Sequence, residues 1–160
     1  MSVVAYKKQL LGRLLEIAEA KEEEAKKTST KAQHRANEEE GAMQSRYSTF
    51  KEEGQYVAGG LKGIHEKFKA DVSTIRSMMN ETIKTNDRVE SMTIADLSFD
   101  DGRNEKIFVF PALGGEKIDD LVLVNPSAPL GRALLRKEVG DTFSYKVGDK
   151  TRKGEVTNVK

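Results

Sequence analysis

The chain has 160 residues, of which 37% are hydrophobic and 33% are charged, and its formal net charge is +1 at pH 7. Hydrophobic content this low beside charge this high is typical of a chain that keeps much of its length on an exposed helical hairpin. The near-zero net charge argues against a general nucleic-acid binder, and the absence of cysteine excludes disulfides and thiolate metal sites.

The N-terminal segment has no apolar run long enough for a signal peptide, and it becomes acidic at residues 22–24. No segment approaches the roughly 20 apolar residues that a membrane-spanning helix needs. We therefore expect a soluble, cytoplasmic protein that does not contact a membrane.

Residues 5–37 are predicted to form one long helix, because they contain no proline, a single glycine and mainly strong helix formers. Apolar and small residues recur there at heptad spacing, which predicts a coiled-coil seam. Large residues occupy the first part of the seam, and alanine, serine and threonine occupy the rest. The seam positions are Leu11, Leu14, Leu15, Ala18, Ala25, Ser29, Ala32 and Ala36.

Residues 45–83 form a second periodic stretch, separated from the first by a break at Gly41. Two helices of about 35 residues joined by a short loop are antiparallel neighbours, each about 50 Å long. We expect the glycines of the second helix to face Ala25 of the first, so that small residues let the backbones approach closely; the alternative is a kink or fraying near residues 58–60. The second seam comprises Tyr47, Phe50, Gly54, Val57, Leu61, Ile64, Phe68 and Ile75.

After Thr85 the pattern changes to strand-like alternation with turn signals, which predicts a small α+β domain. Residues 106–110 are apolar on both sides and indicate a central strand. Residues 121–124 indicate another strand, residues 130–135 a short helix, and residues 143–147 and 151–159 a hairpin. We predict an α+β protein with two domains: an antiparallel coiled-coil hairpin over residues 1–84, with its tip near 38–44, and the α+β domain over residues 85–160.

Two segments carry a resemblance to a known family. The first is the run from Ala128 to Leu135 with Lys137, Gly140 and Asp141 after it. It resembles the Ser-Pro-(Leu/Ile)-(Gly/Ala)-Arg-(Ala/Gly)-Leu pattern of the Gre family of bacterial transcription elongation factors, the GreA/GreB transcript-cleavage factors, with alanine where serine is usual. The second is a weaker match at the start of the second helix. Its residues are Tyr47, Lys51, Glu52, Glu53, Tyr56 and Gly59 or Gly60.

The resemblance implies a C-terminal domain that is FKBP-like and docks on bacterial RNA polymerase, and a hairpin that enters the secondary channel of the polymerase. There an acidic tip helps to hold a Mg²⁺ ion at the polymerase active site, so that backtracked RNA is cleaved. The chain would then be a monomer and no enzyme itself. It would hold no cofactor alone, would contact RNA indirectly and would meet DNA only through the elongation complex. The implied polymerase-binding residues are Ala128, Pro129, Leu130, Gly131 and Arg132.

The tip departs from the family pattern. Counted back from Tyr47, the first acid of the pattern falls on Glu40 and the second on Met43, a residue that cannot bind a hard metal. We therefore expect Glu40, with Glu39 as the neighbouring acid, to be the catalytic pair, and Glu40 to share Mg²⁺ only within the polymerase complex. The alternative is a regulator that occupies the channel without stimulating cleavage, because Met43 replaces the second carboxylate.

Simpler structural roles stay open for these residues. The acids near Glu40 equally fit a solvated helix end. The basic residues Lys26, Lys27, Lys31 and Arg35 fit either contact with backtracked RNA, as the resemblance implies, or a solvated face paired with Glu22, Glu23 and Glu24. His34 and His65 lack a second ligand at helical spacing and are expected to be surface residues. Tyr47 and Phe50 are expected in the seam rather than in a base-stacking platform.

Two other classes of function are weaker alternatives. A prolyl isomerase would need an aromatic-lined pocket, and the chain has no tryptophan. A coiled-coil adaptor without a link to polymerase would need a seam that continues between molecules, whereas the two periodic stretches of this chain satisfy each other.

Overall fold

The computed structural model describes residues 1–38 and 47–160, with the side chains of residues 1–35 and 58–160. The chain forms two compact units, one of Gly12–Met78 and the other of Met1–Leu11 with Met79–Lys160. The domain boundary expected near residue 84 stays a prediction. In the part of the chain that the structure describes, no helix has the apolar length to cross a bilayer.

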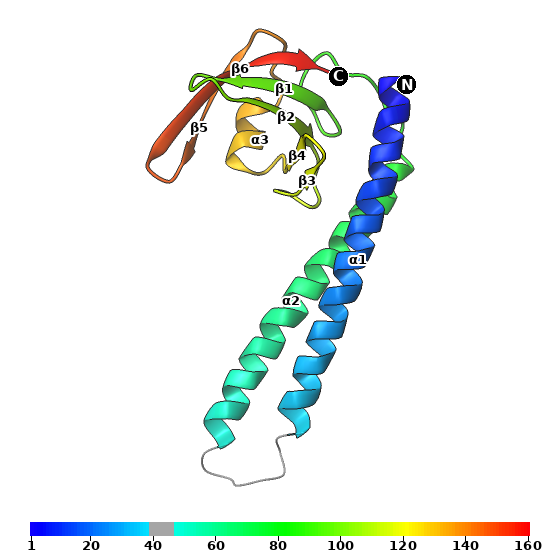
Figure 1. Cartoon of the computed structure of the whole chain (residues 1–160), viewed down its shortest axis with the longest axis vertical. Helices are drawn as coiled ribbons and strands as arrows, with labels where there is room; N and C mark the ends of the chain where they lie inside the picture. The colour runs from blue at the N-terminus through cyan, green and yellow to red at the C-terminus, as the bar shows by residue number, and fades with distance from the viewer. Residues whose placement is uncertain (39–46) are drawn as a thin grey trace. The chain divides into compact units, whose positions relative to one another are not determined.

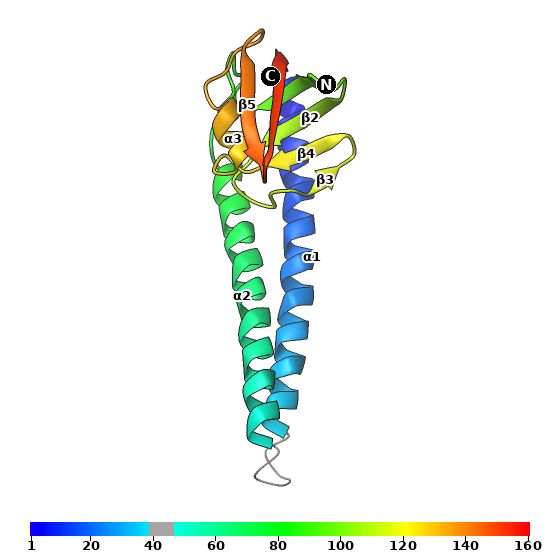
Figure 2. The same cartoon turned by 90° about the vertical axis from the view of Figure 1, so that its left-hand side faces the viewer.

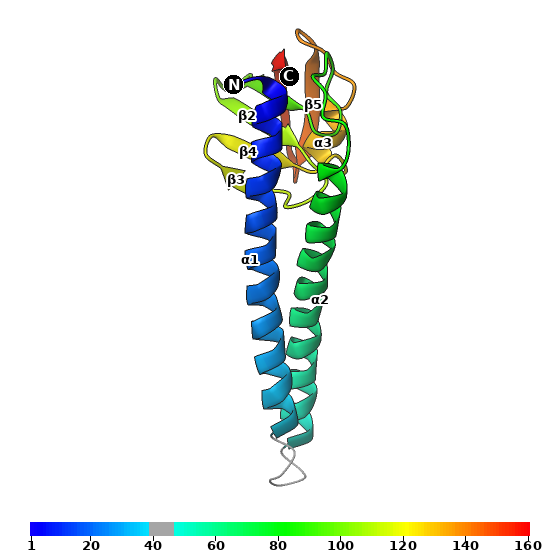
Figure 3. The same ribbon diagram turned by 90° about the vertical axis from the view of Figure 1, so that its right-hand side faces the viewer.

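Two long helices make up the hairpin: α1 over Val3–Glu38 and α2 over Tyr47–Met79. Both lie within a few residues of their predicted bounds. The helices run side by side along the hairpin (Figures 2 and 3). An ion pair joins Glu19 of α1 to Arg76 of α2, with 2.7 Å between the carboxylate and guanidinium atoms. The predicted antiparallel pair is therefore present.

The seam between the helices is packed most tightly where large residues meet, although Ser29 farther along α1 is also buried. Leu14, Ala18, Val72 and Ile75 are 3% exposed or less. Farther along the hairpin the α1 positions are alanine, serine and threonine, and Ala25 is only half-buried. Ile64, a predicted seam residue of α2, is 47% exposed, so its prediction as a core residue is wrong. Small residues opposite it provide too little surface to cover a large side chain.

The described glycines of α2, Gly59, Gly60 and Gly63, do not mediate close contact between the helices. A Cβ atom built on Gly59, Gly60 or Gly63 would meet no atom within 4 Å. The helix nevertheless continues from Tyr47 to Met79 without a break. Close packing of these glycines against Ala25 and fraying near residues 58–60 are therefore wrong, whereas a kink there stays a prediction. These glycines occupy open helical positions that any residue can adopt.

Replacing these glycines should stabilise the hairpin. We expect Gly59→Ala and Gly60→Ala each to raise the free energy of unfolding by about 1 kcal/mol, since alanine loses less backbone entropy in a helix and no atom obstructs its methyl group. Thermal unfolding followed by circular dichroism at 222 nm measures the effect. Gly102→Ala is the matched control. It should destabilise the chain, because Gly102 has a φ angle of 87° that disfavours alanine. Equal shifts in all three variants would contradict this account.

The C-terminal domain is built on one mixed six-stranded sheet with the strand order β3-β4-β2-β1-β6-β5. Strands β2 and β4 are parallel, and the other neighbouring pairs are antiparallel. Helix α3 packs against the sheet (Figure 1). The predicted α+β fold is confirmed, whereas its description as FKBP-like stays a prediction. The elements are β1 Ile94–Phe99, β2 Asn104–Val109, β3 Lys117–Ile118, β4 Leu121–Val124, α3 Pro129–Leu134, β5 Thr142–Val147 and β6 Lys150–Val159.

The core of this domain explains why residues 106–110 are apolar on both sides. Phe108 and its neighbours Ile107 and Val109 are fully buried, and successive residues of a strand point to opposite faces. Both faces of β2 are therefore covered. Leu134 of α3 is fully buried in the cluster that also holds Phe143 of β5. This cluster fixes α3 against the sheet and so places the residues that precede and follow the helix.

Lys7 is an unusual buried residue near the start of α1. Its side chain is 0% exposed, and its ammonium group donates a 2.8 Å hydrogen bond to the carbonyl oxygen of Lys84. Burial lowers the pKa of Lys7 from its ordinary value of 10.5, because it removes water from the charged form. The hydrogen bond ties the Met1–Leu11 segment to the chain that leads into the sheet domain.

Because the amine of Lys7 is buried, the free energy of unfolding should change with pH in the alkaline range. Between the lowered pKa of folded Lys7 and 10.5, the unfolded chain binds more protons, so the free energy of unfolding rises with pH through this window. Lys7→Met keeps the volume and removes the titration. We expect the difference in unfolding free energy between wild type and variant to change toward pH 10.5, as measured by urea unfolding at several pH values. Parallel pH profiles would contradict this.

Candidate functional site

The turn before α3 is organised by Asn125 at the end of β4. Its side-chain oxygen accepts a 2.8 Å hydrogen bond from the backbone amide of Ser127, and its backbone carbonyl accepts one of 3.0 Å from Ala128. Pro129 then opens the helix, a position that suits proline because no intrahelical donor is lost there. The sequence Asn-Pro-Ser-Ala-Pro therefore makes a rigid turn that sets the direction of α3.

Ala128 occupies the N-cap position but cannot cap the helix. Its backbone is extended, as an N-cap residue requires, and no side-chain hydrogen bond is present. Ala128→Ser would supply a hydroxyl acceptor for the free amides of the first turn. We expect this variant to gain about 1 kcal/mol of unfolding free energy, as measured by thermal unfolding. Ala133→Ser, in the helix interior, is the control and should give no gain; a gain of equal size there would contradict a capping effect.

Gly131 is buried because α3 crosses directly over the turn. A Cβ atom at this position would overlap the carbonyl oxygen of Asn125 and lie 2.9 Å from the Cα atom of Pro126. Both obstructing groups are backbone, which cannot rotate aside. A residue without a side chain is therefore required here to bring the helix against the loop.

The structure brings the predicted polymerase-binding residues together on one turn of chain, but it exposes them unequally. Pro129 and Arg132 are exposed, whereas Ala128 and Leu130 are half-buried and Gly131 is buried. Leu130 packs against the domain core. Among the described residues Arg132 has no ion pair. The motif therefore has two roles: Leu130 and Gly131 hold the helix in place, and Pro129 and Arg132 are available to a partner.

The predicted catalytic residues Glu39 and Glu40 lie outside the described residues, as do Met43 and Gln44. The tip predicted near residues 38–44 also lies outside the described residues beyond Glu38. The roles assigned to the tip acids stay predictions.

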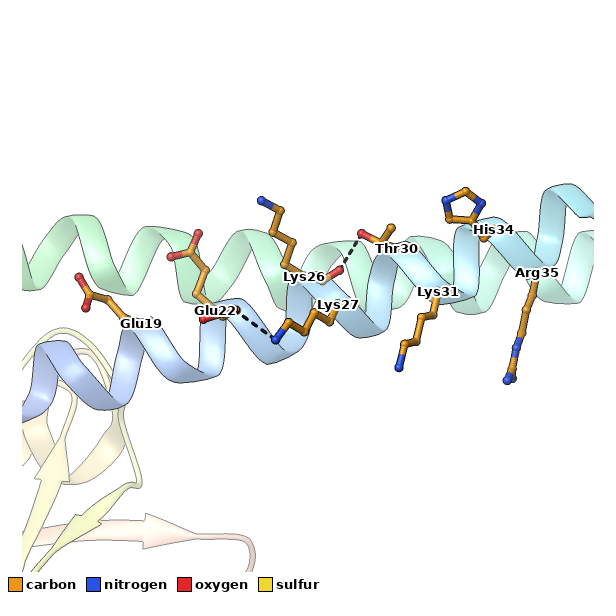
Figure 4. A pocket seen from close by; sticks show the side chains of 9 residues that line it. Glu19, Glu22, Lys26, Lys27, Thr30, Lys31, His34 and Arg35 are labelled. Atoms are coloured by element: carbon orange, nitrogen blue, oxygen red, sulfur yellow. Dashed lines mark hydrogen bonds and ion pairs between the residues drawn. The ribbon is translucent and has the colours of Figure 1, made fainter.

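The basic residues of α1 form two rows rather than one stripe. Figure 4 shows Lys27, Lys31 and Arg35 on one side of the helix and Lys26 and His34 on the other. Spacing of four residues within each row explains the division. All of them line a groove along α1, together with Glu19, Glu22, Glu23 and Thr30.

The acids on α1 neutralise these rows only in part. Lys27 pairs with Glu23 at 3.2 Å between the charged atoms, and both side chains are exposed. Glu19 and Glu22 instead reach across to α2, where Glu22 approaches His65. Within the described residues, Lys31 and Arg35 have no ion pair. The expectation of a solvated face paired with Glu22, Glu23 and Glu24 is met among the described residues by the Lys27–Glu23 pair.

His65 is not the surface residue that was expected. Its side chain is 19% exposed, and its Nε2 atom lies 3.7 Å from a carboxylate oxygen of Glu22. Helix α1 covers it, since residue 65 falls on the side of α2 that faces its neighbour. His34 is exposed, as expected. In the described part of the chain no three acidic, histidine or cysteine side chains gather as a metal site would need.

A cavity of the sheet domain lies beside α3 and has a volume of about 590 Å³. Phe143 is the single aromatic residue among its described lining residues, which include Asp100, Lys137 and Lys153. A prolyl isomerase site would need an aromatic wall, so this cavity does not support that alternative.

The acids with shifted pKa values serve structural pairs at the surface. Arg103 donates backbone and side-chain hydrogen bonds to Asp101 and so lowers the pKa of that carboxyl group. Lys106 donates a 2.8 Å hydrogen bond to Asp120 and lowers its pKa likewise. A carboxyl group held ionised in this way is a poor general acid at neutral pH.

Comparison with known proteins locates the similarity mainly in the C-terminal half. The family model described as "Transcription elongation factor, GreA/GreB, C-term" matches residues 84–160. No curated protein sequence matches the chain at a significant level.

The solved structures that match this chain have low sequence identity to it. The GreA factor homolog 1 (Gfh1) of Thermus thermophilus is 16% identical, with coverage of 96% of this chain and 94% of that one and a TM-score of 0.40. Thermus aquaticus Gfh1 is 15% identical, with coverage of 94% and 92% and a TM-score of 0.41.

Proposed function

Because residues 84–160 belong to the GreA/GreB C-terminal family of transcription elongation factors, we propose that this chain binds bacterial RNA polymerase through its sheet domain. The hairpin then enters the secondary channel of the enzyme. The observation that supports this most is α3: Gly131 fixes the helix against its turn, while Arg132 stays exposed and without an ion pair among the described residues. A rigid turn that presents a free guanidinium suits protein docking.

In the first form of this proposal, the chain stimulates cleavage of backtracked RNA. Glu40 and Glu39 supply carboxylate oxygens to a Mg²⁺ ion that the polymerase already holds. The chain binds no metal alone and is no enzyme itself, since the cleavage chemistry belongs to the polymerase. It acts as a cytoplasmic monomer and meets DNA only within the elongation complex.

The cations of α1 favour passage of RNA along the hairpin. Lys31 and Arg35 lie near the end of α1 without ion pairs among the described residues. A phosphate backbone close to the tip would be attracted by these charges, and two or three such contacts steer a strand without reading its sequence.

In the second form, the chain occupies the channel and regulates the polymerase without stimulating cleavage. The observation that favours this form is Met43 at the position where the second tip acid is expected, since its thioether is a poor ligand for Mg²⁺. Binding to polymerase is common to both forms, and they differ only in the chemistry of the tip.

A stalled elongation complex with backtracked RNA and Mg²⁺ separates the two forms. The first form predicts that the chain shortens the RNA faster than the complex alone, and that Glu40→Gln abolishes the acceleration. Lys8→Gln, at an exposed position of α1 far along the sequence from the tip, is the control and should retain it. No acceleration despite binding would exclude the first form and leave the second.

A further inference from the structure

The hairpin is packed unequally along its length. Its inner half, defined as residues 14–22 of α1 and 65–78 of α2, contains the seam residues given above as 3% exposed or less. Its outer half is defined as residues 25–35 of α1 and 58–64 of α2. Among the described side chains of the outer half, Ser29 alone is buried, at 8% exposure. Little apolar surface therefore holds the outer half together.

A groove lies between the two helices where the outer half begins. Its lining includes Ala25 of α1 with Leu61 and Ile64 of α2, and its volume is about 230 Å³. Ile64 is 47% exposed, because the methyl group of Ala25 is too short to cover it. Apolar contacts that a larger residue would make are therefore missing at this level, and a low density of such contacts lowers local stability.

The polar contacts between the helices belong to the inner half. Glu19 pairs with Arg76 at 2.7 Å, and a carboxylate oxygen of Glu22 lies 3.7 Å from Nε2 of His65. In the outer half, two threonine hydroxyl groups of α1 donate to carbonyl oxygens of their own helix. Between the described residues of the outer half, no ion pair or hydrogen bond joins α1 to α2. Neither apolar nor polar contact therefore compensates for the open groove.

The backbone of α2 adds to this difference between the halves. Gly59, Gly60 and Gly63 each lose more conformational entropy in a helix than alanine would. Since an added Cβ atom at any of the three would meet no atom within 4 Å, close packing does not offset this loss. A short helical segment with little tertiary packing is only marginally stable in water.

We propose that the outer half of the hairpin opens as a unit while the inner half stays paired, with the boundary at the Glu22–His65 contact. In the ground state both helices are continuous. Opening is a minor state in which the outer half separates and its amides lose protection. A partner that encloses the hairpin would close this state, and the ordering would lower its affinity. The inference concerns the chain alone and does not depend on the function proposed above.

Amide hydrogen exchange of the full chain at neutral pH, followed by mass spectrometry, measures the opening. Protection factors in the outer half should be at least about 100-fold lower than those in the inner half. Low concentrations of urea should speed exchange in the inner half more steeply than in the outer half, because global unfolding exposes more surface than local opening does.

Filling the groove should suppress the opening. Ala25→Leu adds three carbon atoms at a position that lines the groove, and it should raise protection of the outer half about tenfold without changing the inner half. Ala20→Leu is the matched control: Ala20 is exposed on the same helix, so the identical change should leave both halves as in wild type. Leucine and alanine are both strong helix formers, so the comparison isolates packing.

Two results would overturn the inference. Equal protection of the two halves would mean that the hairpin opens as one unit. A gain in Ala25→Leu no larger than that in Ala20→Leu would mean that the groove does not limit stability.

Gly60→Ala with Gly63→Ala is an independent check that leaves the groove unchanged. This variant should raise protection of the outer half at least about tenfold, since both methyl groups enter open space. Unchanged protection there would contradict the contribution of the glycines to opening.

Discussion

Gly131→Ala should destabilise the C-terminal domain by about 3 kcal/mol or more and abolish docking on polymerase. The added methyl group would overlap the carbonyl oxygen of Asn125 and press on Pro126, so α3 must move away from its turn. Leu134, fully buried in the core, would be withdrawn with it. Amide hydrogen exchange of the sheet strands in the full chain, followed by mass spectrometry, measures the loss of protection.

The same substitution elsewhere in the chain provides the control. Gly59→Ala adds an identical methyl group in open space and should leave exchange in the sheet unchanged. Wild-type protection of β2 and β6 in Gly131→Ala would contradict the inference that α3 lies too close to the turn to admit a methyl group at residue 131.

Phe143→Ala should cost about 3–5 kcal/mol of unfolding free energy, because a large ring would be removed from a closed core. Phe143 is 4% exposed and meets the ring of Phe99 edge to face, with 5.5 Å between the ring centroids. It also covers Gly154 of β6, where an added Cβ would lie 2.7 Å from the Phe143 ring. For a domain of this size the loss is a large fraction of total stability.

Calorimetry of the full chain measures this effect as a lowered transition temperature of the sheet domain. Val147→Ala, on the same strand but 49% exposed, should change stability by no more than about 0.5 kcal/mol. A similar shift in both variants would mean that β5 contributes through strand pairing and not through the Phe143 ring.

The long-range pattern of the fold was predictable from periodicity. Heptad spacing located α1 and α2, and the residue range predicted for β4 coincides with the strand at Leu121–Val124. The short helix predicted over residues 130–135 corresponds to α3. The resemblance to the Gre family is confirmed by the match over residues 84–160. The two-residue strand β3 was missed, because Lys117–Ile118 is too short to show alternation.

The details of packing were not predictable, because they depend on the register between elements. Ala25 lines a groove with Leu61 and Ile64 instead of meeting Gly59. A difference in register between the two helices changes which residues lie opposite one another, and it leaves the periodicity of each helix unchanged. The requirement for Gly131 likewise depends on how closely α3 crosses the Asn125 turn, which sequence spacing does not specify. The burial of Lys7 and the partial burial of His65 were missed for the same reason.

The predicted polymerase-binding motif illustrates how residues of one motif can differ in exposure. Residues 128–132 were predicted to bind polymerase, and the structure separates them into residues that hold α3 and residues that a partner can reach. The exposure of Leu135 and Val139 could not be predicted from the sequence, since apolar residues near a short helix are ordinarily assigned to the core.

The most direct test of the central claim is equilibrium binding of the labelled full chain to bacterial core RNA polymerase at moderate salt, followed by fluorescence anisotropy. We predict saturable binding of one chain per polymerase with a dissociation constant of about 10 µM or tighter, and loss of binding in Gly131→Ala. Absence of saturation at about 100 µM, with the wild-type chain fully folded, would contradict the account.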